Sequence, residues 1–419
     1  MLLRVTNTPR DYPWGSRTAI ARLTGRPPSG RPEAELWLGA HPLCPSRIVD
    51  PAQAGGHATL DAWIAADPDR ALGPGRTSDE LPFLLKVVAA EAPLSIQVHP
   101  DAVQAHQGYD DENRRGVPLT GPDRVYRDSR HKPELALAID GPFEALVGFR
   151  PLEATRQLVA ELAATAHAGR LAGADRLGDL GHTLDRAAGP GVDPEPVLRR
   201  LVGGFLAGDG AARSLVPVVA EAARKAPRGH GLDRELDTLA DLAVGRPGDA
   251  GVLVALLLNH VMLRPGEAVY LPPGTVHAYL RGVAIEVMAA SDNVVRAGLT
   301  DKHVDVHELQ RLAAFRVTTD PYLAPLRAVP GTALFDAGLP DFALAVVTAS
   351  DAGRARVDLS GPAIALALDG EVHVTGQDGE AVLRAGESVF ITPDERTLAV
   401  AGRGRVAVAG AGLRMGVPA

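Results

Sequence analysis

The chain has 419 residues, of which 46% are hydrophobic, and a formal net charge of −8 at pH 7; its length predicts two or three domains, and its mild acidity argues against nucleic acid as a partner. The one cysteine, Cys44, excludes an intrachain disulfide framework and indicates a reducing compartment. Because the N-terminus lacks a signal-peptide pattern and no apolar run approaches the ~20 residues of a membrane span, we expect a cytoplasmic protein without a membrane partner.

The first 90 residues predict short strands, turns and one helix. Residues 34–42 alternate as a strand does, and residues 58–72 carry apolar side chains near helical spacing. Residues 81–88 are nearly continuously apolar but contain Lys86, one of only four lysines among 43 basic residues. Lysine is a compact charge whose pKa moves readily on burial. Lys86 therefore either extends its ammonium group to the strand edge or binds an anion inside the protein.

Residues 93–101 predict a strand with one apolar and one polar face. The polar face carries Ser95, Gln97 and His99, because a period of two sends alternate side chains to the same side. Two ligands that converge from one strand suit a zinc ion. The alternative is an ordinary half-exposed strand with a polar outer face.

A second candidate metal ligand follows an exposed helix and loop that we expect over residues 101–130. In the stretch His131-Lys132-Pro133-Glu134, the proline excludes a helix interior and favours an extended Lys132. Glu134 opens a strand of alternating apolar residues. Its carboxylate either completes a metal sphere or is a solvated residue at a strand end.

Residues 151–250 differ from the flanking sequence in composition. They are rich in Ala, Leu, Arg and Glu at helical spacing, with breaks at Gly and Pro. We expect four to six helices that serve as a scaffold or lid.

Strand patterns resume near residue 252. Residues 263–279 alternate strands with Pro-Gly turns, as in a double-sheet jelly roll, and place His277 just after a turn, where it can point inward. In residues 283–288, Glu286 lies on the face opposite to the apolar residues. Arg296 follows among small and apolar neighbours, and such an arginine usually has an anionic partner. A structural ion pair of Arg296 with Asp292 or Glu286 is the alternative to a functional role.

The last hundred residues predict an all-β unit after a short helix over 303–316. The run 383–391 repeats the pattern of 263–271, which indicates an internal repeat. The second copy lacks the histidine and the Gln-x-His strand, so we expect it to lack a metal site.

Four stretches occur here in one order: Gln97-x-His99, His131 to Glu134, Pro272 to His277, and Ser291 to Thr300. Together they resemble type I mannose-6-phosphate isomerases, which are zinc enzymes of the cupin superfamily. The resemblance implies a mainly β fold with two cupin (jelly-roll) barrels and an α-helical domain. The implied division is a catalytic cupin domain at 1–150 and 251–316, a helical insertion at 151–250, and a C-terminal cupin-like barrel at 317–419.

The resemblance also implies one zinc ion per chain with four ligands, which are Gln97, His99, Glu134 and His277. One carboxylate, two imidazoles and a neutral amide leave the site with net positive charge, which suits Lewis-acid chemistry. A set of two histidines and one carboxylate can also hold iron for oxygen chemistry, but the added Gln97 and the motif around Arg296 favour an isomerase.

The implied reaction interconverts mannose 6-phosphate and fructose 6-phosphate through a cis-enediol. The resemblance gives Arg296 the role of stabilising the enediolate. Lys132 and His131 are candidates for ring opening and proton movement, and Glu286 is a second candidate base. Lys86 and Ser95 are the predicted phosphate contacts. The alternative function is a sugar-binding or regulatory protein with two barrels and no catalysis. We expect a monomer, with a dimer as the alternative.

Overall fold

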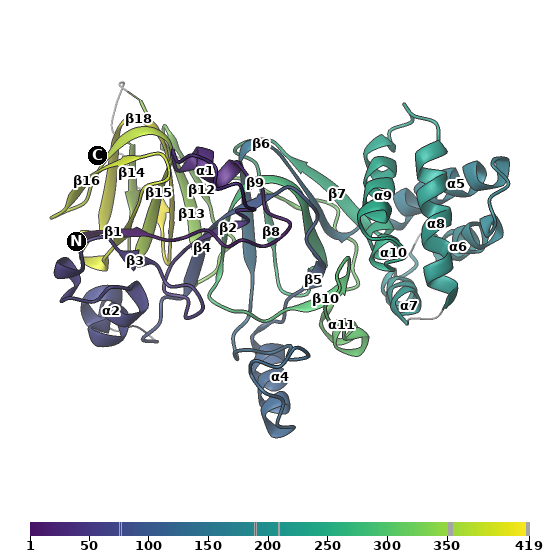
Figure 1. The fold of residues 1–419 in the computed structure, drawn as a ribbon, viewed down its shortest axis with the longest axis horizontal. Coiled ribbons are helices and arrows are strands. Elements are labelled where there is room, and N and C mark those ends of the chain that lie inside the picture. The colour runs from purple at the N-terminus through teal and green to yellow at the C-terminus, as the bar shows by residue number, and fades with distance from the viewer. Residues whose placement is uncertain are drawn as a thin grey trace.

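The computed structural model describes residues 1–74, 76, 78–187, 189, 191–207, 210–327, 329–350 and 355–415. Two β-sheets and a group of helices follow one another along the longest axis of the molecule (Figure 1). The helices lie at one end, the sheet built mainly from the last hundred residues lies at the other, and the remaining sheet lies between them. Among the described residues, no helix is long and apolar enough to cross a membrane.

The central sheet, which we call the first sheet, has nine antiparallel strands. Its longest strands, β6 and β9, pair along most of their length and form its middle. The strands of the first sheet are β2 (Glu35–Leu38), β4 (Phe83–Ala90), β5 (Ile96–Val98), β6 (Glu134–Phe149), β7 (Leu258–Leu263), β8 (Ala268–Leu271), β9 (His277–Ala289), β10 (Val295–Gly298) and β11 (Tyr322–Leu323).

The second sheet has ten antiparallel strands and includes the start of the chain, because β1 pairs with β17. Leu3 and Val5 are buried in that pairing, which explains why the first strand joins the end of the chain. The strands of the second sheet are β1 (Leu2–Thr6), β3 (Arg47–Ile48), β12 (Thr332–Phe335), β13 (Ala343–Ala349), β14 (Ala355–Asp358), β15 (Ala363–Thr375), β16 (Glu380–Arg384), β17 (Ser388–Ile391), β18 (Thr397–Gly410) and β19 (Arg414–Met415).

The pairing of the described strands leaves both sheets open. The expectation of two closed barrels is therefore replaced by a coarser description. The molecule is a mixed α/β protein with two antiparallel sheets and a helical region.

The two sheets repeat one pairing scheme. Strand β6 pairs with β7, β8 and β9, and strand β15 pairs with β16, β17 and β18. The turns that precede β8 and β17 also match. In each turn a glutamate accepts the backbone N–H of an arginine three residues earlier, Arg264 to Glu267 at 2.8 Å and Arg384 to Glu387 at 2.9 Å. The predicted repeat between 263–271 and 383–391 is thus a repeat of structure.

The helical region lies between β6 and β7, where the second sheet has only the short turn from β15 to β16. Its helices bury their apolar faces in one core that extends to Phe149 and Leu258 at the ends of the two flanking strands. They are α5 (Leu152–Ala168), α6 (Ala174–Ala187), α7 (Glu195–Leu206), α8 (Gly210–Lys225), α9 (Asp233–Gly245) and α10 (Gly251–Leu256), which agrees with the expected four to six helices.

Shorter helices cover the rest of the molecule. The helix expected over 58–72 is two helices, α2 (Leu60–Ala66) and α3 (Pro68–Leu72), because Pro68 starts a new helix that Asp67 caps. The exposed helix expected after residue 101 is α4 (Ala102–Arg114), which projects from the molecule (Figure 1). The remaining helices are α1 (Ala19–Leu23), α11 (Val306–Leu312) and two 3₁₀ turns, η1 (Pro51–Ala54) and η2 (Pro393–Glu395).

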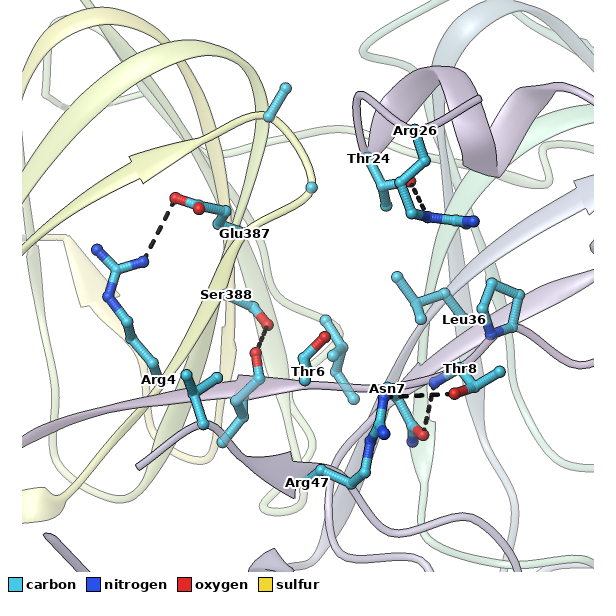
Figure 2. A pocket seen from close by; sticks show the side chains of 16 residues that line it. Arg4, Thr6, Asn7, Thr8, Thr24, Arg26, Leu36, Arg47, Glu387 and Ser388 are labelled. Atoms are coloured by element: carbon cyan, nitrogen blue, oxygen red, sulfur yellow. Dashed lines mark hydrogen bonds and ion pairs between the residues drawn. The ribbon is translucent and has the colours of Figure 1, made fainter. Parts of the chain in front are cut away.

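A shared apolar core joins the two sheets. Leu135 and Leu137 of β6 pack in the same cluster as Phe342 and Phe390 from the second sheet. A polar cavity of about 490 Å³ lies beside β1 at this junction (Figure 2), where Arg4 pairs with Glu387 at 3.3 Å. None of the candidate metal ligands lines this cavity, so the cavity is not the predicted metal site.

Candidate metal centre and active site

Three buried side chains in the first sheet converge on one point. His99, Glu134 and His277 each offer a ligand atom, and these atoms all lie within 4.8 Å of one another. Glu134 bridges the two rings, with its Oε1 at 3.3 Å from His99 Nε2 and its Oε2 at 3.2 Å from His277 Nε2. The three side chains come from β9, from the N-terminal end of β6, and from the residue after β5. The predicted convergence of these three residues is confirmed.

The orientation of each ring suits a metal ion. His99 Nδ1 lies 2.8 Å from the carbonyl of Asn293, and His277 Nδ1 lies 2.8 Å from the carbonyl of Thr275. A ring nitrogen beside a carbonyl carries the proton and donates it, so Nε2 keeps its lone pair. Both Nε2 atoms, and Glu134 Oε2, are buried without a hydrogen-bond partner among the described residues. Orphaned lone pairs of this kind fit a divalent cation.

The electrostatics favour the protonation states that bind metal. Burial, reinforced by the charge of Lys132, lowers the pKa of His99 to about 4. Burial alone would raise the pKa of Glu134, but the neighbouring His99 and Lys132 hold it well below its usual range. Near neutral pH, His99 is thus a neutral imidazole and Glu134 an ionised carboxylate.

Gln97 lies beside these ligands on the same face of the sheet. It pairs directly with His277 on one side and with Arg296 on the other. Residues opposite one another on antiparallel strands point to the same face. The row therefore presents an imidazole, an amide and a guanidinium together, and the amide oxygen of Gln97 is available as a fourth ligand.

A second cross-strand row carries Lys86. Register places Trp37, Lys86 and Glu286 side by side on β2, β4 and β9. Lys86 Nζ lies 3.0 Å from Glu286 Oε2 and 4.9 Å from the centre of the Trp37 ring. Burial alone would lower the pKa of Lys86, but Glu286 raises it, and burial raises the pKa of Glu286. Lys86 and Glu286 therefore form a buried ion pair, so Lys86 already has an anionic partner.

Arg296 has no such partner. No carboxylate lies within ion-pair distance of Arg296, Arg127 or Lys302 in the part of the chain that the structure describes, so the expected alternative, an ion pair of Arg296 with Asp292 or Glu286, is not formed there. Burial and the charge of Arg127 lower the pKa of Arg296. Burial and the charges of Arg296 and Arg127 lower the pKa of Lys302. Arg127, Arg296 and Lys302, which lack a carboxylate partner among the described residues, are therefore candidates to bind an anion.

Lys132 and His131 make different contacts although they are neighbours in the chain. Lys132 Nζ lies 3.2 Å from Glu134 Oε1 and is almost fully buried. His131 Nε2 lies 3.1 Å from Asp341 Oδ2, in the loop between β12 and β13 of the second sheet. Ser95 is half-buried, one residue ahead of β5.

Sequence reasoning missed a histidine–carboxylate pair beside the metal cluster. His41 Nε2 lies 3.3 Å from Asp292 Oδ2, and the Leu43 N–H donates to His41 Nδ1 at 3.3 Å, which places the ring proton on Nε2. Burial alone would raise the pKa of Asp292, but the hydrogen bond from His41 lowers it, and Lys132 and Lys86 add to that effect. Trp37 packs edge-on against His41, so Trp37 contacts both Lys86 and the His41–Asp292 pair.

Tyr279 is another residue that sequence reasoning did not single out. Its hydroxyl donates to Glu286 Oε1 at 2.8 Å, and its ring is fully buried. The available signal was the spacing of two from His277, which puts both side chains on one face of β9.

Comparisons with known proteins agree with this geometry. Residues 2–152 match the catalytic domain of the type I phosphomannose isomerase family. The chain is 35% identical over 412 residues to mannose-6-phosphate isomerase of Escherichia coli, covering 96% of this chain and 98% of that protein. It is 31% identical to the Rattus norvegicus mannose-6-phosphate isomerase over 412 residues, which is 93% of each chain.

Solved structures are similar over nearly the whole chain. A zinc-bound holo mannose 6-phosphate isomerase superposes with a TM-score of 0.84 at 33% identity, covering 98% of this chain and 99% of the other. The same values hold for a mannose 6-phosphate isomerase bound with zinc and yttrium.

Proposed function

The chain belongs to the type I phosphomannose isomerase family, and on that premise we propose that it interconverts mannose 6-phosphate and fructose 6-phosphate at the His99–Glu134–His277 site. The observation that carries the proposal is the buried ligand cluster, whose lone pairs lack partners among the described residues, in one cross-strand row with Gln97 and Arg296. We propose Gln97 as the fourth ligand because it lies directly opposite His277.

Zinc, when bound, supplies a Lewis acid next to the reacting carbons. Two imidazoles, a neutral amide and one carboxylate leave the site with net positive charge. Such a site suits a substrate that becomes an oxyanion during the reaction.

The reaction moves one proton between C2 and C1 of the open-chain sugar. A base removes the proton from the carbon next to the carbonyl, which gives a cis-enediolate. A proton passes from the hydroxyl oxygen to the former carbonyl oxygen through the cis-enediol, and the carbon proton, or one from solvent, returns to the other carbon. The enediolate oxygen carries the developing charge. Arg296 adjoins Gln97 and lacks a carboxylate partner among the described residues, so we assign it the stabilisation of that charge.

Two carboxylates are candidates for the base. Glu286 is engaged at both oxygens, by Lys86 and by the Tyr279 hydroxyl. Asp292 is the less buried of the two, with a quarter of its side chain exposed, and His41 orients one of its oxygens. Asp292 therefore fits a base that meets the substrate, whereas Glu286 fits a support for Lys86.

Lys132 is our candidate for ring opening, because its ammonium group lies beside Glu134 at the metal cluster. For the phosphate we propose Arg127 and Lys302, with Ser95 as a hydroxyl donor. This assignment replaces the first expectation for Lys86, whose charge is already compensated by Glu286. A phosphate group there would relieve the mutual repulsion of the cations.

The experiment that tests the function follows fructose 6-phosphate formed from mannose 6-phosphate in a coupled assay, with zinc measured in the same samples. We expect turnover that a chelator abolishes and added zinc restores. Sugar phosphate binding without turnover in the zinc-loaded protein would favour the alternative of a non-catalytic binding protein.

We also propose the finer architecture that the sequence implied. Each sheet is a jelly roll of the cupin type, a reading supported by the shared pairing of β6 and β15 with three later strands. The proposed units are residues 1–150 with 251–316, the helical insertion 151–250, and residues 317–419. A monomeric, cytoplasmic enzyme is consistent with the single cysteine, and light scattering in solution tests the oligomeric state.

A further inference from the structure

The second sheet and its loops make polar contacts with β6 and with the residues just before it. Arg405 of β18 donates to the Ile139 carbonyl of β6 at 3.4 Å, and Asp341 contacts His131, three residues before Glu134. The loop between β12 and β13 places Asp341 Oδ2 3.1 Å from His131 Nε2. About a fifth of the Asp341 side chain and a quarter of the His131 side chain are exposed, so the pair is largely shielded from solvent. The loop is anchored because the next residue, Phe342, is buried in the core between the sheets together with Leu135.

The residues on either side of His131 are held by the active site itself. The Arg130 carbonyl accepts a hydrogen bond from Asn293 Nδ2 at 2.8 Å, and the Lys132 N–H donates to the Pro100 carbonyl at 3.3 Å. Lys132 Nζ then reaches Glu134 Oε1 at 3.2 Å. His131 thus lies between two residues whose backbone groups bond to Asn293 and Pro100, while its own ring is held by Asp341.

The charges around His131 agree with a real ion pair. The hydrogen bond that His131 donates to Asp341 raises the pKa of His131 against the lowering effect of burial, and Asp101 adds to the rise. Tyr270 of β8 is the other titratable group near this carboxylate, and burial together with Asp341 raises its pKa. A protonated imidazole beside a carboxylate makes a strong, directional contact.

We infer that Asp341 of the second sheet is a positioning residue for the isomerase site, which holds His131 and thereby fixes the adjoining Lys132 against Glu134. The inference rests on the proposed function, because that function assigns Lys132 to the opening of the sugar ring. It also gives the second sheet a role in turnover, although that sheet contributes no ligand to the metal cluster.

The test compares Asp341→Asn, Asp341→Glu and the parent enzyme by kcat, KM, zinc content and melting temperature. We expect Asp341→Asn to lower kcat on the order of tenfold, because a small misplacement of a catalytic group is costly. KM for mannose 6-phosphate and zinc content should stay near the parent values, and Asp341→Glu should recover part of the lost kcat. The double variant Asp341→Asn with His131→Asn should be no slower than the slower of the two single variants, because both changes break the same contact.

The matched control is Asp140→Asn on β6, the strand that carries Glu134. Asp140 lies 3.7 Å from Arg22 with both side chains exposed, far along β6 from Glu134, and its loss should leave kcat unchanged.

Three outcomes would overturn the inference: an Asp341→Asn enzyme with the parent kcat, one that loses zinc or fails to fold, or kcat losses that multiply in the double variant. The first or third result, with an active parent and an inactive Lys132→Ala, removes the role of Asp341 and leaves the proposed function in place. An inactive zinc-loaded parent removes the proposed function itself.

Discussion

The two sheets share one strand plan but bury different chemistry. The first sheet encloses charged and polar side chains, namely Glu35, Lys86, His99, Lys132, Glu134, His277 and Glu286. The core inside the second sheet is almost entirely aliphatic, with residues such as Val372, Leu383 and Val400 fully buried. Since buried charges cost free energy unless they are paired or bind a ligand, the first sheet is built for chemistry and the second for stability.

Comparison of the two repeats shows which metal ligands the second sheet lacks. His277 follows Leu271 by six residues, and the residue six after Ile391 is Thr397. Glu134 pairs with Leu271, whereas the residue paired with Ile391 at the same point is Ala363. Two of the three clustered ligands are therefore replaced by residues that bind zinc poorly. One backbone plan carries both outcomes, so function is decided by side chains at a few register positions.

The largest effect should come from removing a metal ligand that the second sheet lacks. His277→Ala should lose zinc and lower turnover by more than about 1,000-fold, because the metal contributes several kcal/mol of transition-state stabilisation. Thr397→Ala is the matched control in the second sheet and should keep both zinc and turnover. Elemental analysis and the coupled assay measure the two effects, and a zinc-free His277→Ala that turns over normally would break the comparison.

Arg296→Ala should lower kcat by about 10²- to 10³-fold, as the loss of an oxyanion-stabilising donor does. Zinc content should not change, because Arg296 adjoins Gln97 without bonding to the ligand cluster. Arg405→Ala removes an arginine paired with Asp369 in the second sheet and should leave kcat unaltered. Equal losses of zinc and activity in Arg296→Ala would make that residue structural.

Two glycines at matching turns should respond differently to alanine. Gly266 has φ +88° with open space around it, whereas Gly386 has φ +82° and a Cβ there would lie 2.5 Å from the Cα of Thr24. Gly266→Ala should cost about 1–2 kcal/mol of unfolding free energy for the left-handed backbone alone. Gly386→Ala should cost more, since the backbone after α1 must also move, and denaturant titration of both variants measures the difference.

The smallest effect should be a pH-dependent loss of stability in the second sheet. Burial would raise the pKa of Glu395, but its ion pair with the N-terminal ammonium group of Met1, at 2.8 Å, lowers the pKa below the usual value. A depressed carboxyl pKa stabilises the fold above about pH 4.5, and this contribution is lost as pH falls through the folded-state pKa.

Glu395→Gln should therefore lower stability by about 1–2 kcal/mol at pH 7 and flatten the decline on acidification, with turnover per folded molecule unchanged. Unfolding free energies between pH 3 and 7 measure this. A decline as steep as in the parent would show that other carboxylates dominate the acid response.

Much of the site could be predicted from local sequence patterns. Alternation in residues 93–101 placed Gln97 and His99 on one face, and the resemblance to isomerases, which the comparisons confirm, supplied Glu134 and His277. Those predictions succeeded because strand alternation and turn chemistry are local.

The partners of these residues depended on register between distant strands, which no local pattern encodes. The pairing of Lys86 with Glu286 and of His41 with Asp292 arises this way. The same reason explains why the junction of β1 with β17 was missed. Helices were predicted within residues 151–250 as an insertion, but no local pattern shows that the strands on either side of them, β6 and β7, pair with each other.

That place has a consequence for chain entropy. Phe149 pairs with Leu258 across the whole helical excursion, whereas the equivalent hairpin of the second sheet closes over a few residues near Gly376. Closure cost grows only with the logarithm of loop length, so the long excursion adds about 3 kcal/mol relative to the short turn. Helices that fold among themselves and bring their ends together offset much of that cost. The six helices could therefore be exchanged for another self-folding module of similar span, and strands β6, β7 and β9 should still pair.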